Sequence, residues 1–337
     1  MELLLAGVIV AAVIFAGSNG FHDAALTIGN AVVGRALSPK WALGLAVVFN
    51  FIGALLGEGI AIVVANQIVQ FAGAADAILL CILIAFVSAT AWSLFTYWLA
   101  LPVSSTHCLI GGLLGAGIVL GFALDMREAF DSVVLPLLLS PILGFLLAWA
   151  LTLLLSKIFA STPSKPLFRS ARMVDSVLTC SLSLVHGVQD AQKTAALVMV
   201  AIVAVQTAPG ERVDVIDISW PVRIIIALAL ALGTGLSGWR VVRTLSVRMA
   251  KLDPVKSVAA DGAAAVLMYI AALIMRVPVS LTFVLGSAIL GTQYAGRKGH
   301  PRARYFVPMF GVWLLTIPAA ALLAIVIGLI VRVSVGT

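Results

Sequence analysis

Residues 1–33 read MELLLAGVIVAAVIFAGSNGFHDAALTIGNAVV, and this stretch decides the fold class of the chain. Apolar residues run on both sides of a polar insert at 17–23, GSNGFHD. A helix needs roughly 20 apolar residues to cross the roughly 30 Å hydrocarbon core of a bilayer. No basic residues precede the apolar run, and no small-residue cleavage site leads into a hydrophilic domain. We therefore interpret the stretch as a first membrane span rather than a signal peptide.

Apolar runs of span length recur along the rest of the chain. Of its 337 residues, 62% are hydrophobic and 10% are charged, whereas soluble domains contain about 25% charged residues. The composition predicts an all-α polytopic protein of the inner cell membrane, in contact with lipid over most of its surface. The longest nearly uncharged runs lie at 41–65, 77–101, 132–155, 221–239 and 305–331.

Charged loops between these runs alternate in sign. Lys and Arg in short loops mark the cytoplasmic side of a membrane protein, so the basic loops predict an N-terminus outside the cell. The net charge of +7 is explained by these loops and does not indicate a nucleic-acid partner. The basic loops lie at 35–40, 157–172, 240–256 and 297–304, and the acidic loops at 125–131 and 211–217.

Short motifs repeat in the two halves of the chain in the same order. GFHDA at 20–24 matches GVQDA at 187–191, and PVSST at 102–106 matches PVSLT at 278–282. The first half starts outside and the second starts inside, which predicts two inverted-topology repeats, a common build of secondary transporters. We expect a first repeat at 1–158, a cytoplasmic linker at 159–172 and a second repeat at 173–337. The expected spans are 3–33, 41–65, 77–100, 102–123 and 133–157, then 173–206, 221–240, 257–275, 279–296 and 304–331.

Polar residues interrupt the first and sixth spans, at 17–23 and 181–193. Glycines and polar side chains there predict that both helices are broken by unwound backbone. An ionisable side chain at membrane depth costs at least about 2.5–3.5 kcal/mol, so such a residue usually handles an ion or a substrate. Asp23 and Asp190 are the strongest candidates for that role.

The Pro-Val-Ser motifs predict helices that start inside the membrane. Proline suits the first turn of a helix, and Ser or Thr hydroxyls cap its free N–H groups. The N-terminus of a helix carries orphan N–H groups and the positive end of the helix dipole. Two such starts, related by the repeat, could hold a tetrahedral oxyanion between them.

Taken together, these motifs resemble those of the inorganic phosphate transporter (PiT) family. NGFHDAA at 19–25 is similar to the NGFHDxAN signature of bacterial low-affinity phosphate transporters, and HGVQDAQK at 186–193 is similar to HGANDAQK. VFNFIGALLG at 48–57 and PVSSTH at 102–107 also resemble family segments, and the resemblance runs from about 15 to 320. It implies symport of inorganic phosphate with a proton or a sodium ion, without an enzymatic step or a cofactor.

The resemblance also implies roles for individual residues. Asp23 and Asp190 would be the coupling-ion carboxylates, and they are the place for Na⁺ if sodium is the coupling ion. The implied phosphate contacts are Ser104, Ser105, Thr106, Ser280, Thr282, Asn19 and Gln189. The implied coupling-ion shell adds His22, Asn50, Asp261 and Gln192.

Three motifs depart from the family pattern, and the first has AALT at 24–27 where AANA or a similar sequence is expected. Gln189 stands where Asn is usual, and Leu281 and Phe283 replace Thr and His in the second Pro-Val-Ser motif. The second anion cap therefore offers one hydroxyl fewer than the first. These departures leave the identity of the anion open.

Several functional alternatives remain at this point. His22 favours protons as the coupling ion because an imidazole titrates near physiological pH, and a sodium-coupled symporter or a sulfate permease would keep the same fold. A channel would show a continuous polar face along one span, and an enzyme would need a nucleophile or metal cluster. No phosphate-binding loop of the GxxxxGK[ST] type is present. A homodimer is compatible with the sequence.

Overall fold

The computed structural model describes the chain except residues 57–70, 124–126, 128–129, 238–251, 296–302 and 336–337. Within the described residues the secondary structure is almost wholly helical, and seven helices are long and apolar enough to cross a membrane. The elements of the first half are α1 (Glu2–Val33), α2 (Pro39–Leu56), α4 (Ala75–Trp98), α5 (Ser105–Leu120), the π-helical η1 (Phe130–Val134) and α7 (Leu135–Ile158). Those of the second half are α8 (Ser164–Gln206), α9 (Trp220–Gly235), α11 (Pro254–Tyr269), the π-helical η3 (Ile270–Met275), α12 (Leu281–Tyr294) and α13 (Ala303–Val335).

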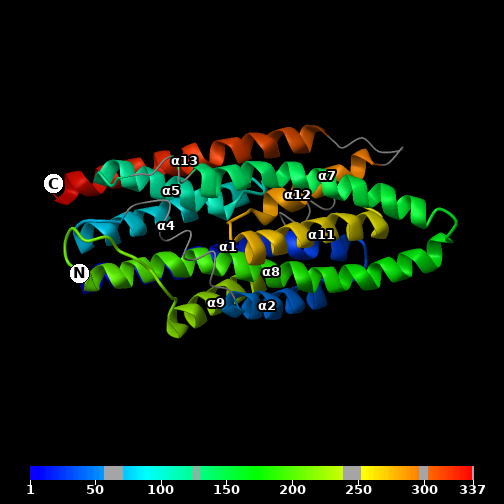
Figure 1. The fold of residues 1–337 in the computed structure, drawn as a ribbon, viewed down its shortest axis with the longest axis horizontal. Coiled ribbons are helices and arrows are strands. Elements are labelled where there is room, and N and C mark those ends of the chain that lie inside the picture. Colours follow the sequence, from blue (N-terminus) through cyan, green and yellow to red (C-terminus); the bar gives the residue numbers. More distant parts are fainter. Residues whose placement is uncertain (57–70, 124–126, 128–129, 238–251, 296–302, 336–337) are drawn as a thin grey trace.

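The two halves enter the bundle from opposite ends. Figure 1 shows both termini at one end of the long axis, which we call the terminal end, and the connection from α7 to α8 at the other, which we call the linker end. Helix α1 starts at the terminal end, whereas α8 starts at the linker end. This arrangement confirms the predicted inversion of the second half relative to the first.

Two helical hairpins meet near the middle of the bundle. Helices α4 and α5 lie together in the terminal half of the molecule, and α11 and α12 lie together in the linker half (Figure 1). The hairpin tips touch where the Thr282 hydroxyl donates a hydrogen bond of 3.0 Å to the Val103 carbonyl. The predicted mid-membrane helix starts are therefore present at Ser105 and Leu281.

Two of the four hairpin helices are too short to cross a membrane alone, whereas α4 and the α11–η3 segment are long and apolar enough to do so. Helix α5 has 16 residues and α12 has 14, so at about 1.5 Å per residue each is about 21–24 Å long and shorter than the roughly 30 Å core. Each hairpin enters from one end of the bundle and returns to it. The two halves keep their opposite orientation.

The expected unwinding at 17–23 and 181–193 is wrong, because α1 and α8 run through both stretches as continuous helices. The glycines serve close helix packing instead. A Cβ atom on Gly20 would lie 2.1 Å from the Leu230 carbonyl oxygen of α9, and one on Gly187 would lie 2.2 Å from the Asn50 carbonyl oxygen of α2. The equivalent glycine of each repeat thus packs a helix of its own half against a helix of the other half: α1 against α9, and α8 against α2.

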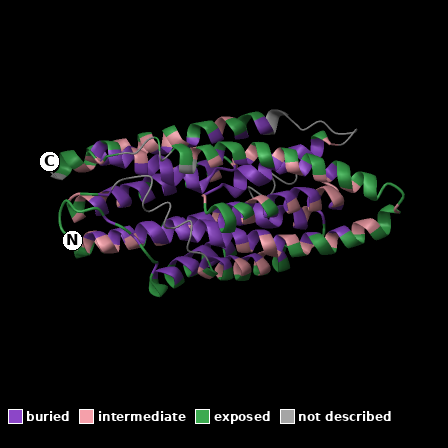
Figure 2. Ribbon diagram, viewed as in Figure 1, coloured by how far each residue is buried: buried purple, intermediate pink, exposed green. Residues whose placement is uncertain are grey.

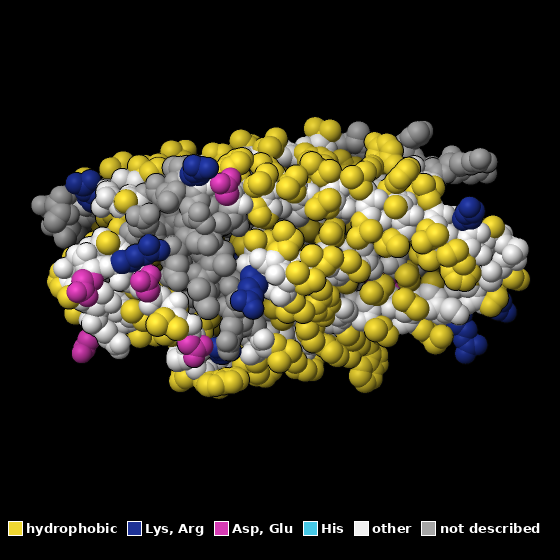
Figure 3. Space-filling model, in the orientation of Figure 1, with side chains coloured by type: hydrophobic (Ala, Val, Ile, Leu, Met, Phe, Trp, Pro, Cys, Tyr) yellow, Lys and Arg dark blue, Asp and Glu magenta, His cyan; other side chains and the backbone are white. Residues whose placement is uncertain are grey.

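The two halves also interlock through the hairpins. A Cβ atom on Gly115 of α5 would lie 2.2 Å from the Ala321 carbonyl oxygen of α13, and one on Gly291 of α12 would lie 2.2 Å from the Phe145 carbonyl oxygen of α7. Each hairpin therefore packs against the last helix of the opposite half. Buried residues fill the centre of the bundle (Figure 2), and a broad hydrophobic surface covers the middle of the face seen in Figure 3.

Candidate functional site

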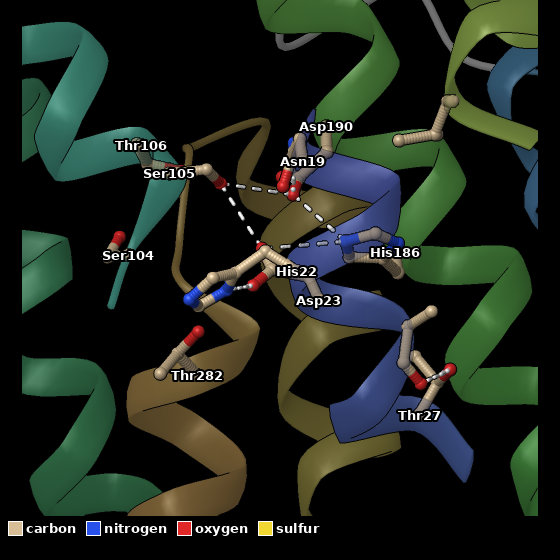
Figure 4. A network of polar contacts seen from close by, with 12 residues as sticks. Asn19, His22, Asp23, Thr27, Ser104, Ser105, Thr106, His186, Asp190 and Thr282 are labelled. Atoms are coloured by element: carbon tan, nitrogen blue, oxygen red, sulfur yellow. Dashed lines mark hydrogen bonds and ion pairs between the residues drawn. The ribbon is translucent and has the colours of Figure 1, made fainter. Parts of the chain in front are cut away.

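Asp23 of α1 and Asp190 of α8 face each other at the tip of the first hairpin (Figure 4). The two residues are 3% and 6% exposed, so both carboxylates are buried at the centre of the bundle. The Ser105 hydroxyl, in the first turn of α5, lies 3.4 Å from Asp23 Oδ2 and 3.4 Å from Asp190 Oδ2. The start of α5 therefore lies beside the carboxylate pair.

His186 bridges the same two carboxylates. Its Nε2 lies 3.0 Å from Asp190 Oδ2 and 3.8 Å from Asp23 Oδ2. One ligand atom from each of these three residues lies within 4.8 Å of the others. The centre therefore has the dimensions of a site for a proton or a small cation.

A hydrogen-bond chain places a hydrogen on Nδ1 of His186. Thr234 donates its hydroxyl hydrogen to the Leu230 carbonyl at 2.9 Å, so its oxygen accepts from Asn50 Nδ2 at 3.2 Å. Asn50 Oδ1 then faces His186 Nδ1 at 2.8 Å and accepts from it. Since Nδ1 carries a hydrogen, Nε2 can bond to the Asp190 carboxylate only when it is protonated as well. The 3.0 Å approach of Nε2 to Asp190 is an ion-pair distance without hydrogen-bond geometry, and a proton on Nε2 would allow that bond to form.

Asp190 has more polar partners than Asp23. Asn19 Nδ2 donates to Asp190 Oδ2 at 3.0 Å, and Lys193 Nζ lies 2.5 Å from Asp190 Oδ1 while also contacting the Thr106 hydroxyl. Asp23 Oδ1 accepts from His22 Nδ1 at 2.7 Å. The repeat places Leu26 where the second half has Lys193. One carboxylate therefore has a built-in cation and the other does not.

The remaining predicted anion contacts lie around the two hairpin tips. Ser104 caps α5 by accepting from the His107 N–H at 3.2 Å, and Ser280 stands at the same position before α12, 4% exposed. Thr282 directs its hydroxyl to Val103 of the other tip. Gln189 Oε1 accepts from the Val279 N–H at 3.4 Å. The structure therefore groups Asn19, Ser105 and Thr106 with the carboxylates, and Ser104, Ser280, Thr282 and Gln189 with the tips.

Phe283, which replaces His in the second motif, forms part of an aromatic stack. Its ring centroid lies 4.6 Å from that of His107 and 4.1 Å from that of Trp313. Trp313 Nε1 donates to the Pro102 carbonyl at 3.1 Å. The replacement thus supports the tip of the first hairpin and takes no place in the carboxylate centre.

The predicted ion shell is only partly assembled. Asn50 reaches the carboxylates through His186, and Gln192 is buried on α8 at 3% exposure. Asp261 instead pairs with Asn30, whose Nδ2 donates to its Oδ1 at 2.6 Å. Asp261 therefore does not contact the carboxylate centre.

Sequence reasoning missed the roles of His186 and Lys193. Aligning the repeats on Asp23 and Asp190 pairs His186 with Asn19, and both side chains do reach Asp190. That pairing was available in the sequence. The contact of Lys193 with Thr106 depends on the approach of α5 to α8 and had no local signal.

Comparisons with known proteins agree with this arrangement. The model of the phosphate transporter family matches residues 19–174 and again 164–324, which fits two repeats. A probable low-affinity inorganic phosphate transporter of Bacillus subtilis is 32% identical over 317 residues, covering 94% of this chain and 93% of that protein. One of Rhizobium meliloti with the same description is 32% identical over 323 residues, covering 95% and 94%.

A solved structure described as the sodium-dependent phosphate transporter shares the fold. Its TM-score is 0.82 at 19% identity, and the match covers 98% of this chain and 99% of that one. The apolar helices and the bacterial relatives make this chain a multi-pass protein of the inner membrane. The chain belongs to the phosphate transporter family.

Proposed function

We propose that this protein is a symporter that carries inorganic phosphate across the inner membrane together with a coupling cation. The observation that carries the proposal is the position of Asp23 and Asp190, buried and joined through Ser105 to the start of α5. A helix start supplies N–H donors for an anion, and carboxylates supply a place for a cation. The relatives named above are described as phosphate transporters.

The fixed charges of the centre explain why anion and cation would travel together. Asp23, Asp190 and Lys193 leave one net negative charge when both histidines are neutral. That charge repels an incoming anion in a buried, weakly screened site. A proton or small cation at the carboxylates removes the repulsion. Anion binding then requires the cation, which is the condition for symport.

Several donors would serve the phosphate once the cation is bound. The first N–H groups of α5 and α12 have no partners within their helices, and the Ser105, Thr106 and Ser280 hydroxyls stand beside them. Gln189 Nε2 is a buried donor without a partner among the described residues. These groups suit the several oxygen atoms of a tetrahedral anion.

The carboxylates favour phosphate over sulfate. Near pH 7 phosphate still carries a proton that it can donate to a carboxylate oxygen, whereas sulfate has only acceptors. A sulfate ion beside Asp23 would meet a second acceptor with no hydrogen between them. We therefore place phosphate first and keep sulfate as the alternative anion.

A proton is the coupling ion that the His186 geometry supports. The chain through Thr234 and Asn50 requires a hydrogen on Nε2 if His186 is to bond to Asp190. Sodium is the second candidate, because Asp23, His186 and Asp190 cluster within 4.8 Å and Asn19 Oδ1 is buried without a partner among the described residues.

Uptake into proteoliposomes tests the proposal. The purified protein is reconstituted, and labelled phosphate or sulfate is offered under an imposed proton gradient, an imposed sodium gradient, or neither. We expect phosphate to accumulate above its external concentration under the proton gradient, with sulfate not accumulating. Accumulation only under the sodium gradient would replace the proton with sodium. No accumulation of either anion under either gradient would contradict symport.

A further inference from the structure

We propose that an anionic phospholipid binds in an apolar groove at the linker end of the bundle, with its acyl chains between the helices and its phosphate among basic side chains. The groove has a volume of about 390 Å³ and lies where the end of α7 and the start of α8 meet the start of α11. Val174 of α8 lines the groove and precedes Asp190 by about 24 Å of helix. The groove is therefore separate from the carboxylate centre, and ligand binding there can be measured without transport.

The lining of the groove suits acyl chains. Apart from Thr162 and Ser170, the residues that line it are apolar. The surface beside it along the helices is apolar as well, because Ile158 is 58% exposed and Val177 is 68% exposed. Exposed apolar side chains of a membrane protein are covered by the hydrocarbon of the bilayer. The groove therefore opens toward lipid, which supplies acyl chains to fill it. Its apolar lining includes Leu155 of α7, Leu167 of α8 and Val258 of α11.

Basic side chains flank the same groove along the chain. Lys157, Lys165 and Arg169 are exposed, and each lies within two residues of a residue that lines the groove. No Asp or Glu occurs between 157 and 172, and no ion pair involves these three residues in the described part of the chain. Figure 3 shows Lys and Arg side chains at the linker end of the visible face. Their long, flexible stems let the charged groups reach a headgroup at the mouth of the groove.

Two further charged residues near the groove are engaged elsewhere. Arg172 donates from its Nε to the Gly34 carbonyl at 3.0 Å. Asp253 caps α11 by accepting from the N–H groups of Val255 and Lys256, each at 3.0 Å. The start of α8 has no side-chain cap, and the first N–H groups of a helix have no acceptor within it. The mouth of the groove therefore has an excess of positive charge and backbone donors, which suits the phosphate of an anionic lipid.

A phospholipid with a net negative charge matches both parts of the groove. A free phosphate ion has no chain to fill the apolar lining, and a lipid without net charge gains less from the unpaired Lys and Arg side chains. A second copy of this chain, packed here about a two-fold axis, would bring two basic linkers close together, and like charges repel. Each Lys or Arg near an anionic lipid surface contributes about a fivefold increase in affinity.

Thermal stability of the purified full-length protein in a neutral detergent tests the site. Unfolding midpoints are recorded against increasing phosphatidylglycerol, phosphatidylcholine, or glycerol phosphate, which carries the headgroup charge without chains. A ligand that binds only the folded state raises Tm in a saturable way. We expect a saturable rise with phosphatidylglycerol and a smaller rise with phosphatidylcholine.

The charged part of the site is tested with two double variants. Lys165→Gln with Arg169→Gln removes two basic side chains beside the groove, so the half-saturating concentration of phosphatidylglycerol should increase by about thirtyfold, which is two factors of about five. The matched control is Arg35→Gln with Lys40→Gln, which removes the same charge from another basic loop and should leave that concentration unchanged. All four positions are exposed, so both double variants should fold.

The apolar part of the site is tested by filling it. Ser170→Trp introduces a large side chain at an exposed position that lines the groove and keeps every charge. The response to both lipids should weaken. Ser161→Trp, at an exposed serine of the same linker that does not line the groove, is the control and should behave as wild type.

Four results would overturn the proposal. Equal responses of the wild type to the two lipids would remove the charge selectivity. An unchanged response to phosphatidylglycerol in Lys165→Gln with Arg169→Gln would remove the basic side chains from the site. A rise with glycerol phosphate that is lost in that variant would assign the mouth of the groove to a soluble anion. A change of oligomeric mass in Ser170→Trp, measured by light scattering, with lipid responses unchanged would assign the groove to a second copy.

Discussion

At the scale of single residues, the two repeats provide an unequal pair of carboxylates. Asp190 is held by Lys193, Asn19 and His186, whereas Asp23 has His22 and the shared Ser105 hydroxyl. The built-in ammonium ion satisfies one carboxylate permanently. The other is left to respond to a mobile cation. We therefore propose that the mobile cation is shared between His186 and Asp23, and that the fixed partners of Asp190 hold it mainly in place.

This asymmetry predicts the effect of removing the ammonium ion. Lys193→Met leaves Asp190 buried with less compensation, which should lower the free energy of unfolding by about 3–5 kcal/mol. The measurement is the unfolding midpoint of the purified protein. The matched control is the double variant Lys193→Met with Asp190→Asn, which should recover most of the loss because the unpaired charge is gone. Equal instability of the single and double variants would contradict the assignment.

The residues of the centre were partly predictable from the sequence. Asp23, Asp190 and Ser105 were predicted because ionisable residues and helix-start motifs stand out within apolar spans. The role of Lys193 was missed because its contact with Thr106 depends on the approach of α5 to α8, which no local pattern reports.

At the scale of elements, glycines decide how closely the helices pack. Gly20 and Gly187 were predicted to unwind their helices, but both sit in continuous helix against the backbone of a neighbour. A glycine within an apolar segment fits either role, and only the neighbouring helix distinguishes them. The helix starts at Ser105 and Leu281 were predictable because Pro-Val-Ser is a local signal that does not depend on packing.

Alanine substitution separates the packing glycines from exposed ones. Gly20→Ala and Gly187→Ala would place a Cβ atom about 2 Å from a carbonyl oxygen, and the required helix shift should cost about 1–3 kcal/mol. Gly44→Ala in α2 is the control, since a Cβ atom there meets nothing within 4 Å, and it should be neutral or stabilising by up to about 1 kcal/mol. The unfolding midpoint is measured for all three variants. Equal changes in the packing variants and in the control would contradict the packing role of Gly20 and Gly187.

At the scale of the whole molecule, the two halves form one interlocked bundle. Each hairpin rests on the last helix of the opposite half, and the hairpin tips meet beside the carboxylates. The inverted order of the halves was predictable from charge alternation and repeated motifs. The hairpins could not be predicted from the sequence, because their helices are as apolar as membrane-crossing helices.

The charge pattern also predicts the orientation of the bundle in the membrane. Lys157, Lys165 and Arg169 lie near the linker end, so that end should be cytoplasmic. In a background without Cys81, Cys108 and Cys180, a membrane-impermeant thiol reagent should label Glu211→Cys in intact cells. It should label Ser161→Cys only after the membrane is opened. The reverse labelling pattern would invert the orientation.

The most direct test of cation-coupled transport compares two fluxes in the Asp23→Asn variant. Reconstituted protein is assayed for exchange of labelled phosphate across the liposome at equal concentrations, and for accumulation of phosphate driven by an imposed proton gradient. Removing the Asp23 carboxylate should leave phosphate exchange largely intact. It should reduce proton-driven accumulation by at least about tenfold, because a loss of about 1.4 kcal/mol of coupling free energy corresponds to a factor of ten. Accumulation equal to that of the wild-type protein would contradict the coupling role of Asp23.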